Sequence, residues 1–547
     1  MTTSNAAIRI VPLPLIFLVF LGGVIACGEP SPYIASISPR LGMPGEILII
    51  DGKNFGEVQD KSYVTIAQIF PTMSSYIEWT DTKIALRLPE FGESALIYIQ
   101  RGDKKSNPVL ISNRATLPQP MPWSDGDQKP RILSIEPASA VIGALIIIQG
   151  SNFGSSRDTS GVFFTRDEPS SLSNTSPAWM EVFDADFGYE LWSDREIQVR
   201  VPDGAVRGNL EIRTPRGNSE PFFFEIIDKP GTKIFKEKQV YTLSYTVGIR
   251  TREAPVPNAL YLWFPRPVLS SSQSPVQLLS WTRMPFMENY RGTVLFKFND
   301  LSPYTAMETT LSFRLEIYAV STSVRESLIK ESGTFPVETV YTLPGPLIPS
   351  DHTLIKSHTN TIIGRERNPY LKARKIYDWL ITQGGIRSEP VSGGVLEALD
   401  RKRTDPYGAA LFFCAMARAG GIPALPISGV LIGRTQEVIR HYWAEFWIDG
   451  FGWIPLDPAL GAGALPADYA LEQNPAAYYF GNMDNRHIAF SRGERVLSQM
   501  EVRGKTVVRE RDFALQNIWE ESLGDIDYDS QWGDVVIVQT TDEGPGL

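Results

Sequence analysis

The sequence predicts a multidomain protein with two all-β sandwiches, a further β domain and a C-terminal α+β domain. Three observations support this order. A block of sequence at residues 31–113 recurs at 130–228, strand-like alternation continues through 229–348, and helical periodicity appears only beyond residue 349. A chain of 547 residues is also too long for one hydrophobic core, so several domains of ordinary size are expected.

The repeat consists of two pairs of matching segments. Residues 32–56 recur at 130–154, an offset of 98 (130 minus 32), and 79–89 recur at 192–202, an offset of 113 (192 minus 79). The second copy therefore carries about fifteen additional residues between its matching segments. Short β-branched runs bounded by Gly and Pro predict strands, and each copy has the size of a small β-sandwich.

Both copies contain Pro-x-Ile-x-x-Ile-x-Pro followed by Gly-x-Asn-Phe-Gly, in which Gly56 and Gly154 are predicted to adopt positive φ at a turn. This pattern resembles the IPT/TIG family of immunoglobulin-like domains. The resemblance implies immunoglobulin-like sandwiches at 31–113 and 130–228, which act in other proteins as spacers or as protein-binding modules. We expect spacers here, because such sandwiches commonly serve as generic scaffolds. A Pro-rich stretch at 114–129 predicts a semi-rigid linker between them.

The N-terminal segment predicts export and attachment to a membrane. Arg9 is followed by an apolar run from Ile10 to Ala26, which is short for a membrane span and typical of a secretory signal. The run ends in Val-Ile-Ala-Cys, which resembles the lipobox of bacterial lipoproteins. The resemblance implies removal of residues 1–26 and acylation of Cys27, so that acyl chains hold an exported protein to a bacterial membrane in the cell envelope. An uncleaved anchor, or an ordinary signal with a chance cysteine, remains an alternative.

The composition excludes several classes of partner. A formal net charge of −10 and the lack of a sustained Lys/Arg run argue against a nucleic-acid partner. Two cysteines cannot form a stabilising disulfide framework. His352, His358 and His487 lack Cys, Asp or Glu partners at metal-ligand spacing, so the sequence predicts neither a zinc site nor a cofactor.

The remaining segments separate into β, helical and acidic parts. Residues 229–348 alternate apolar and polar side chains and predict a third β domain. Apolar residues at helical spacing predict helices over 370–380 and 409–419, the second of which is stopped by two glycines. Residues 501–547 form a C-terminal extension, and we expect its acidic part from Glu520 onward to extend into solvent.

A hairpin in the helical region holds the candidate catalytic residues. Residues 441–447 and 452–458 alternate like neighbouring strands, and the turn between them would bring His441 beside Asp457. Thiol-dependent acyl transfer needs a cysteine at a helix start, an imidazole that lowers the pKa of the cysteine, and a carboxylate that orients the imidazole. The hairpin supplies the last two of these parts.

The motifs of this region resemble the transglutaminase-like superfamily. His-x-Trp-x-Glu at 441–445 and Gly-Trp-x-x-x-Asp-Pro at 452–458 are similar to the superfamily's own segment. Arg-Ala-Gly-Gly-Ile-Pro-Ala at 418–424 is similar to its Arg-Ala-x-Gly-Ile-Pro-Ala, and Tyr-Phe-Gly-Asn-Met-Asp at 479–484 accompanies them. The resemblance implies a papain-like α+β fold for 349–500, in a superfamily that includes acyl transferases, proteases and non-catalytic relatives.

The nucleophile of that superfamily is missing. Its cysteine stands fifteen residues before the glycine of Gly-Ile-Pro, which is position 406 here (421 minus 15), and this position holds proline. A proline side chain has no acidic proton or lone pair, so it cannot attack a carbonyl group. Asp405 and Pro406 nevertheless form a good helix start, with Asp as the N-cap and Pro at the first helical position. His441 and Asp457 would then be a residual triad.

Three further residues are candidates for a role beside the vacant position. Cys414 lies eight residues past Pro406, roughly 12 Å along a helix, and its apolar neighbours predict a buried thiol with a raised pKa. Tyr407 is at most a ligand contact, because a phenol is a poor acyl acceptor at neutral pH. Trp443 is a second candidate contact, although core packing is the expected role of Trp443 and Trp453.

The sequence therefore predicts a non-catalytic envelope lipoprotein whose transglutaminase-like domain binds protein or cell-wall peptide. Two alternatives stay open. One is a thiol-dependent acyltransferase or peptidase that uses Cys414, His441 and Asp457, and the other is a purely structural scaffold.

Overall fold

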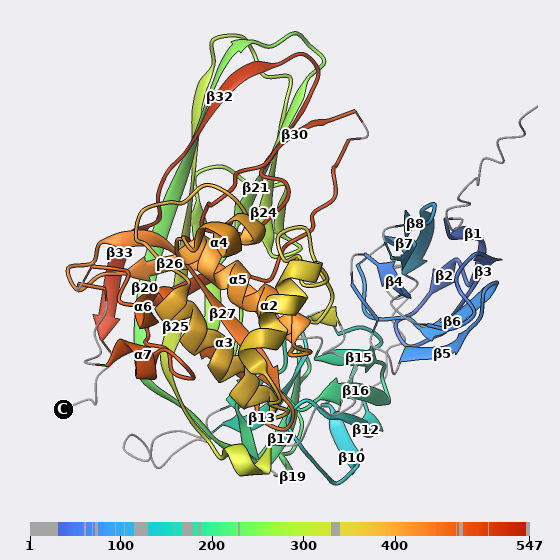
Figure 1. Cartoon of the computed structure of the whole chain (residues 1–547). Coiled ribbons are helices and arrows are strands. Elements are labelled where there is room, and N and C mark those ends of the chain that lie inside the picture. The colour runs from blue at the N-terminus through green and yellow to red at the C-terminus, as the bar shows by residue number, and fades with distance from the viewer. Residues whose placement is uncertain are drawn as a thin grey trace, which may run out of the picture.

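The computed structural model describes residues 31–59, 62–67, 69–71, 75–92, 94–102, 104–113, 129–157, 159–166, 179–183, 188–227, 230–329, 340–466, 468–469, 474–501 and 503–542. The predicted signal segment 1–26, Cys27 and residues 114–128 of the predicted linker lie outside these ranges. Within them, no helix is both long and apolar enough to cross a membrane. The fold class is the predicted one, with β-sandwiches, a further β domain and a C-terminal α+β domain (Figure 1).

The first repeat folds into a two-sheet sandwich. Its sheets have the strand orders β1-β3-β6-β5 and β2-β9-β7-β4, with β8 paired to β7. The strands are β1 Tyr33–Ser38, β2 Leu41–Gly42, β3 Ile47–Lys53, β4 Ser62–Ile66, β5 Tyr76–Trp79, β6 Lys83–Arg87, β7 Ser94–Arg101, β8 Lys104–Lys105 and β9 Val109–Asn113. All of its core residues come from 34–111, so this sandwich has a core of its own.

The second repeat reproduces the first in detail. Its sheets have the orders β10-β12-β16-β15 and β11-β19-β17-β13-β14, with β18 paired to β17. The strands are β10 Arg131–Glu136, β11 Ser139–Ala140, β12 Leu145–Ser151, β13 Gly161–Arg166, β14 Trp179–Glu181, β15 Tyr189–Trp192, β16 Glu196–Arg200, β17 Ala205–Thr214, β18 Gly217–Asn218 and β19 Phe222–Ile226. A register shift within 34–36 recurs within 132–134. Gly56 and Gly154 adopt φ values of 98° and 96°, as predicted.

The second sandwich shares its core with the C-terminal domain. One continuous cluster of buried side chains contains Trp192 of the sandwich together with Trp443 and Trp447 of the C-terminal sheet. Gly143 lies at this contact with φ of 87°, and a Cβ atom there would stand 2.6 Å from the Trp447 ring. The second repeat is therefore part of the wall of the C-terminal domain, in addition to any role as a spacer.

The third β domain is completed by the end of the chain. One sheet has the order β22-β25-β20-β32, with β33 paired to β20, and the other has the order β23-β24-β21-β31-β30. The strands are β20 Gly231–Glu253, β21 Ala259–Pro265, β22 Gln273–Trp281, β23 Met287–Tyr290, β24 Thr293–Asn299, β25 Ala306–Val324, β30 Lys505–Val507, β31 Glu520–Leu523, β32 Asp527–Trp532 and β33 Val536–Asp542. In Figure 1 the red strand β32 lies against the green strands of this domain.

The predicted solvent-exposed acidic tail is thus corrected. Residues 520–542 form three strands because their alternating side chains pair with β20 and β21. Arg252 binds Asp527 at 2.8 Å and also pairs with Asp529 at 2.5 Å, which offsets the acidity of β32. Residues 543–547 lie outside the described ranges.

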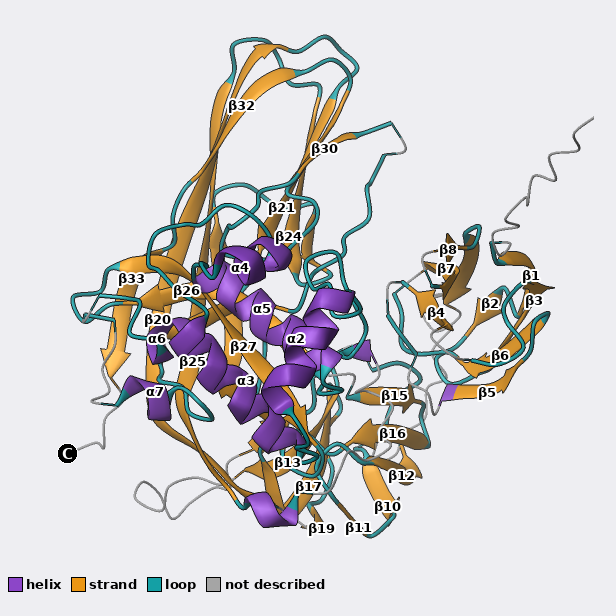
Figure 2. Cartoon of the chain, viewed as in Figure 1, coloured by secondary structure: helices purple, strands orange, loops and turns teal. Residues whose placement is uncertain are grey.

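The C-terminal α+β domain has a four-stranded antiparallel sheet with the order β28-β27-β26-β29. Its strands are β26 Ala424–Ile432, β27 Val438–Ile448, β28 Gly452–Leu456 and β29 His487–Arg492, and its helices are α2 Thr353–Ile363, α3 Pro369–Gln383, α4 Val395–Arg401, α5 Pro406–Ala419, α6 Pro458–Gly461 and α7 Pro475–Tyr478. Figure 2 shows the helices gathered beside the strands. The predicted helices over 370–380 and 409–419 correspond to α3 and α5.

Alternation along β27 divides the domain into two layers. Tyr442, Ala444 and Phe446 are buried in the cluster that contains α5. Trp443 and Trp447 point to the opposite face and belong to the cluster of the second sandwich. The sheet is consequently buried on both faces, with helices on one and a β-sandwich on the other.

Candidate functional site

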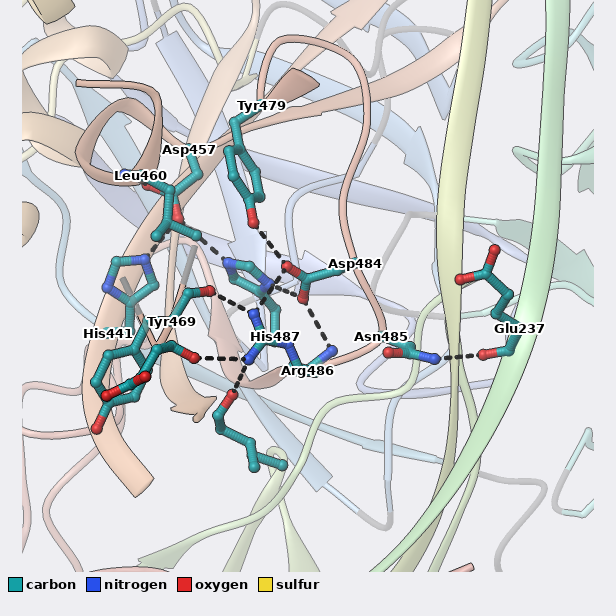
Figure 3. Close-up of polar contacts among 12 residues, drawn as sticks. Glu237, His441, Asp457, Leu460, Tyr469, Tyr479, Asp484, Asn485, Arg486 and His487 are labelled. Carbon is teal, nitrogen blue, oxygen red and sulfur yellow. Dashed lines mark hydrogen bonds and ion pairs between the residues drawn. The ribbon is translucent and has the colours of Figure 1, made fainter. Parts of the chain in front are cut away.

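The predicted hairpin brings the imidazole and the carboxylate together. Strands β27 and β28 pair from Ala444↔Leu456 to Ile448↔Gly452, and Asp457 follows β28 directly. The Nε2 atom of His441 lies 2.6 Å from Oδ2 of Asp457, and both side chains are fully buried (Figure 3).

Asp457 is held in place by the helix that it begins. Its Oδ1 atom accepts hydrogen bonds from the backbone N–H groups of Ala459 and Leu460, at 2.9 and 3.0 Å. Asp457 is thus the N-cap of α6, and its second oxygen remains available to the imidazole. The local sequence Asp-Pro favours this start, because proline fits the first helical position.

A second histidine, which the sequence reasoning missed, joins the same carboxylate. The Nε2 atom of His487 lies 3.2 Å from Asp457 Oδ2, and its Nδ1 atom lies 2.8 Å from Asp484 Oδ1. Tyr479 donates its hydroxyl to Asp484 Oδ2 at 2.9 Å, and Figure 3 shows these side chains converging. The prediction that His487 lacks carboxylate partners was wrong. The available signal was Asp484, three residues before His487 and within the 479–484 motif.

The electrostatics of this polar cluster (His441, Asp457, Tyr479, Asp484 and His487) follow from its burial. Burial alone would raise the pKa of Asp457, but the two imidazoles hold it well below its ordinary value. Burial alone would lower the pKa of His487, but its two carboxylate partners raise it to about 9.

The other ring nitrogen of His441 is unoccupied. Nδ1 of His441 is buried and has no hydrogen-bond partner among the described residues. The start of α5 adjoins this part of β27, because the rings of Tyr407 and Tyr442 meet with their centroids 5.0 Å apart. Pro406 stands at the first position of α5, and Asp405 caps the helix by accepting the Gly408 N–H at 2.8 Å. The helix start is preserved, but it offers no nucleophilic atom.

The C-terminal extension covers the start of α5. The guanidinium of Arg511 pairs with Asp405 and donates to the carbonyl of Val391, and it stacks over the Tyr407 ring at 4.8 Å. Tyr442 donates its hydroxyl to the carbonyl of Asp512 at 3.0 Å. Tyr407, a predicted ligand contact, is therefore enclosed by protein on several sides.

Cys414 lies deep in the helical layer. Its side chain is fully buried on α5, and burial raises the pKa of the thiol to about 12. The Cys414 thiol does not bond His441, because Nε2 of that ring bonds Asp457 and Nδ1 has no hydrogen-bond partner among the described residues. The geometry therefore argues against Cys414 as the nucleophile.

We expect Cys414 of the folded chain to resist iodoacetamide at pH 7.5. With a pKa of about 12, roughly one thiol in ten thousand or fewer is ionised at that pH, and the ionised form is the reactive one. Mass spectrometry of the chain from residue 28 measures this directly, since Cys414 is then its single cysteine. The same sample in denaturant should be fully alkylated. Rapid modification of the folded chain would identify Cys414 as an activated thiol.

Trp443, the other predicted ligand contact, lines a cavity. The cavity has a volume of about 40 Å³ and lies where the second sandwich and the third β domain meet the C-terminal sheet. Asp484 and His487 also line it, so the polar cluster reaches this cavity although His441 does not. Trp443 and Trp453 are both buried, as expected for core packing, and both present part of their surface to the cavity.

Comparison with family models gives two matches. The description "Transglutaminase-like superfamily" matches residues 356–458, which include α5, His441 and Asp457. The IPT/TIG domain matches residues 32–112 and 130–180.

Comparison with individual proteins gives matches of low identity or short length. An uncharacterized protein of Haemophilus influenzae is 27% identical over 219 residues, covering 31% of this chain and 58% of the relative. A cyclomaltodextrin glucanotransferase of Paenibacillus macerans is 36% identical over 61 residues, covering 11% of this chain and 8% of that enzyme. The chain thus spans less than two thirds of either curated relative. A solved structure of a candidate cysteine protease from Cytophaga hutchinsonii is 14% identical with a TM-score of 0.38, covering 58% of this chain and 96% of that chain.

Proposed function

We propose that this chain, which carries a transglutaminase-like domain and IPT/TIG domains, is a non-catalytic binding protein of the bacterial cell envelope. Its transglutaminase-like domain would bind an envelope protein or a cell-wall peptide. The observation that carries this proposal is Pro406 at the start of α5, where the superfamily has its cysteine. His441 retains its carboxylate, but among the described residues no side chain bonds its Nδ1 atom and could be activated for attack.

Attachment to the membrane is the second part of the proposal. The lipobox-like sequence that ends at Cys27 supports acylation of that residue, and acyl chains of this kind bury about 0.8 kcal/mol per CH2 group in a bilayer. Metabolic labelling with a radioactive fatty acid tests it. Label should enter the wild-type chain and be lost in Cys27→Ser, and label retained by that variant would contradict this attachment.

The cavity beside Trp443 is the proposed ligand site. Two largely buried ion pairs line it, Lys233 with Asp203 at 2.6 Å and Arg492 with Glu445 at 2.7 Å. Aromatic side chains, among them Trp443, line it as well. A volume of about 40 Å³ is far below the roughly 300–1,000 Å³ of a site that encloses a small ligand, so the cavity would admit one group of a ligand and not the whole of it. The mixed polar and aromatic lining suits one side chain of a bound peptide, with the rest of the peptide outside the cavity.

Blocking this cavity should weaken binding. Ser271 lines the cavity from a loop, and Ser271→Trp is expected to lower the affinity for soluble cell-wall peptides roughly 10-fold or more by filling it. Isothermal titration of the chain from residue 28 with muropeptides measures the change. Ser357→Trp, on the exposed surface of α2, is the matched control and should leave affinity unchanged. Equal affinity in both variants would place the ligand elsewhere.

A further inference from the structure

Three metal-ligating atoms converge inside the polar cluster. They are Nε2 of His441, Oδ2 of Asp457 and Nε2 of His487, and all lie within 4.8 Å of one another. The three side chains are buried and come from β27, the N-cap of α6 and β29. Two imidazoles and one carboxylate are a donor set that suits Zn²⁺ and similar transition ions better than Mg²⁺ or Ca²⁺.

One of the separations between these atoms already matches that of a tetrahedral site. Zinc bonds to nitrogen and oxygen of about 2.0–2.1 Å place neighbouring ligand atoms about 3.3 Å apart. His487 Nε2 and Asp457 Oδ2 are already 3.2 Å apart. His441 Nε2 and Asp457 Oδ2 are 2.6 Å apart, so this pair would have to open by about 0.7 Å, which a side-chain rotation can supply.

Two of the three ligands have supporting groups of the kind found in protein zinc sites. His487 directs its Nδ1 atom to Asp484 at 2.8 Å, and Asp484 is fixed in turn by Tyr479. A carboxylate behind a histidine ligand fixes the orientation of the ring and increases its basicity. The backbone of α6 occupies Asp457 Oδ1 and leaves Oδ2 for an ion. Nδ1 of His441 has no such support among the described residues, which makes His441 the weaker of the two imidazole ligands.

The cavity lies beside one of the three proposed ligands, His487. His487 and Asp484 line it, and its volume of about 40 Å³ exceeds the 10–15 Å³ that one water needs. A zinc ion with three protein ligands commonly takes a water as its fourth.

We infer that His441, Asp457 and His487 bind one Zn²⁺-class transition ion. This inference rests on the proposed non-catalytic function, because an ion on His441 Nε2 and Asp457 Oδ2 occupies the pair that a thiol enzyme would need. The bound ion ties the hairpin, α6 and β29 together beside the ligand cavity. Binding to the folded chain alone would also raise its melting temperature.

The test uses the untagged chain from residue 28, which contains every described residue. After treatment with a chelator and its removal, the chain is titrated with Zn²⁺ by calorimetry and with Co²⁺ by visible absorption. We expect one ion per chain and the d–d bands of tetrahedral Co²⁺. His487→Gln should weaken affinity roughly 100-fold, and His441→Gln should weaken it less. His352→Gln, on the exposed N-cap of α2, should have no effect.

Several outcomes overturn the inference. A folded wild-type chain that takes up no stoichiometric Zn²⁺ or Co²⁺ rules out the site without any variant. Binding that survives in His487→Gln, checked as folded by circular dichroism, would be adventitious. Failure of metal binding leaves the proposed function intact, since that function depends on Pro406. Rapid alkylation of Cys414, or release of amine from a peptide amide, would instead contradict the proposed function itself.

Discussion

Replacing Pro406 with cysteine should produce a thiol that reacts with iodoacetamide roughly 100-fold or more faster than Cys414 at neutral pH. The new side chain would stand at the first turn of α5, where backbone N–H groups favour a thiolate. The rings of Tyr407 and Tyr442, the residues after positions 406 and 441, meet, so the start of α5 lies beside the strand that carries His441. Nδ1 of His441 has no hydrogen-bond partner among the described residues. Position 406 is partly exposed, so the reagent can reach it.

The pH dependence of alkylation separates an activated thiol from an ordinary one. Ser357→Cys, on the exposed surface of α2, supplies the reference. For Pro406→Cys, the midpoint pH, at which the alkylation rate is half of its maximum, should lie about one unit or more below that of the reference. In the double variant that also carries His441→Gln, most of this difference should disappear. If the midpoints coincide, position 406 does not face His441, and the assignment of the vacant nucleophile position is wrong.

Replacing Asp457 with alanine should destabilise the C-terminal domain by about 3–5 kcal/mol. The substitution removes the partner of two buried imidazoles and the cap of α6 at once. For a domain of this size the melting temperature should fall by roughly 10 °C or more. Thermal unfolding followed by near-ultraviolet circular dichroism, with a chelator present, measures the change without any contribution from a bound ion.

Asp378→Ala is the control for this prediction. Asp378 pairs with Arg374 on the surface of α3, and an exposed pair of this kind contributes at most about 1 kcal/mol. Its melting temperature should therefore stay close to that of the wild type. A similarly small effect of Asp457→Ala would show that the polar cluster is not a rigid part of the fold.

The features that the sequence predicted correctly involve residues that are close to one another in the sequence. His441 and Asp457 are joined by one tight hairpin, so their contact follows from alternation and a turn. The start of α5 was predictable because Asp405 and Pro406 are adjacent and each has a definite positional preference. Gly56 and Gly154 were predictable because a repeated turn requires the same backbone twice.

The features that sequence reasoning missed depend on distant pairing. His487 reaches Asp457 because β29 pairs with β26, and no local pattern encodes that neighbour. The acidic segment from Glu520 was expected in solvent because its partner Arg252 is more than 250 residues earlier in the chain. The sequence also gives no sign that Gly143 approaches Trp447. The glycine can be explained by a turn in its own domain and the tryptophan by core packing in its own domain, so neither residue indicates a contact between the two domains.

The continuous packing between the second sandwich and β27 has a mechanical consequence. A pull applied at the N-terminal side of the second sandwich would pass directly into the sheet that carries the polar cluster. The first sandwich is packed separately, and the Arg157–Glu90 ion pair at 3.0 Å joins it to the second. The first sandwich should therefore move as a separate unit, whereas the second sandwich and the C-terminal domain should respond to a pulling force as one body that includes the cavity wall.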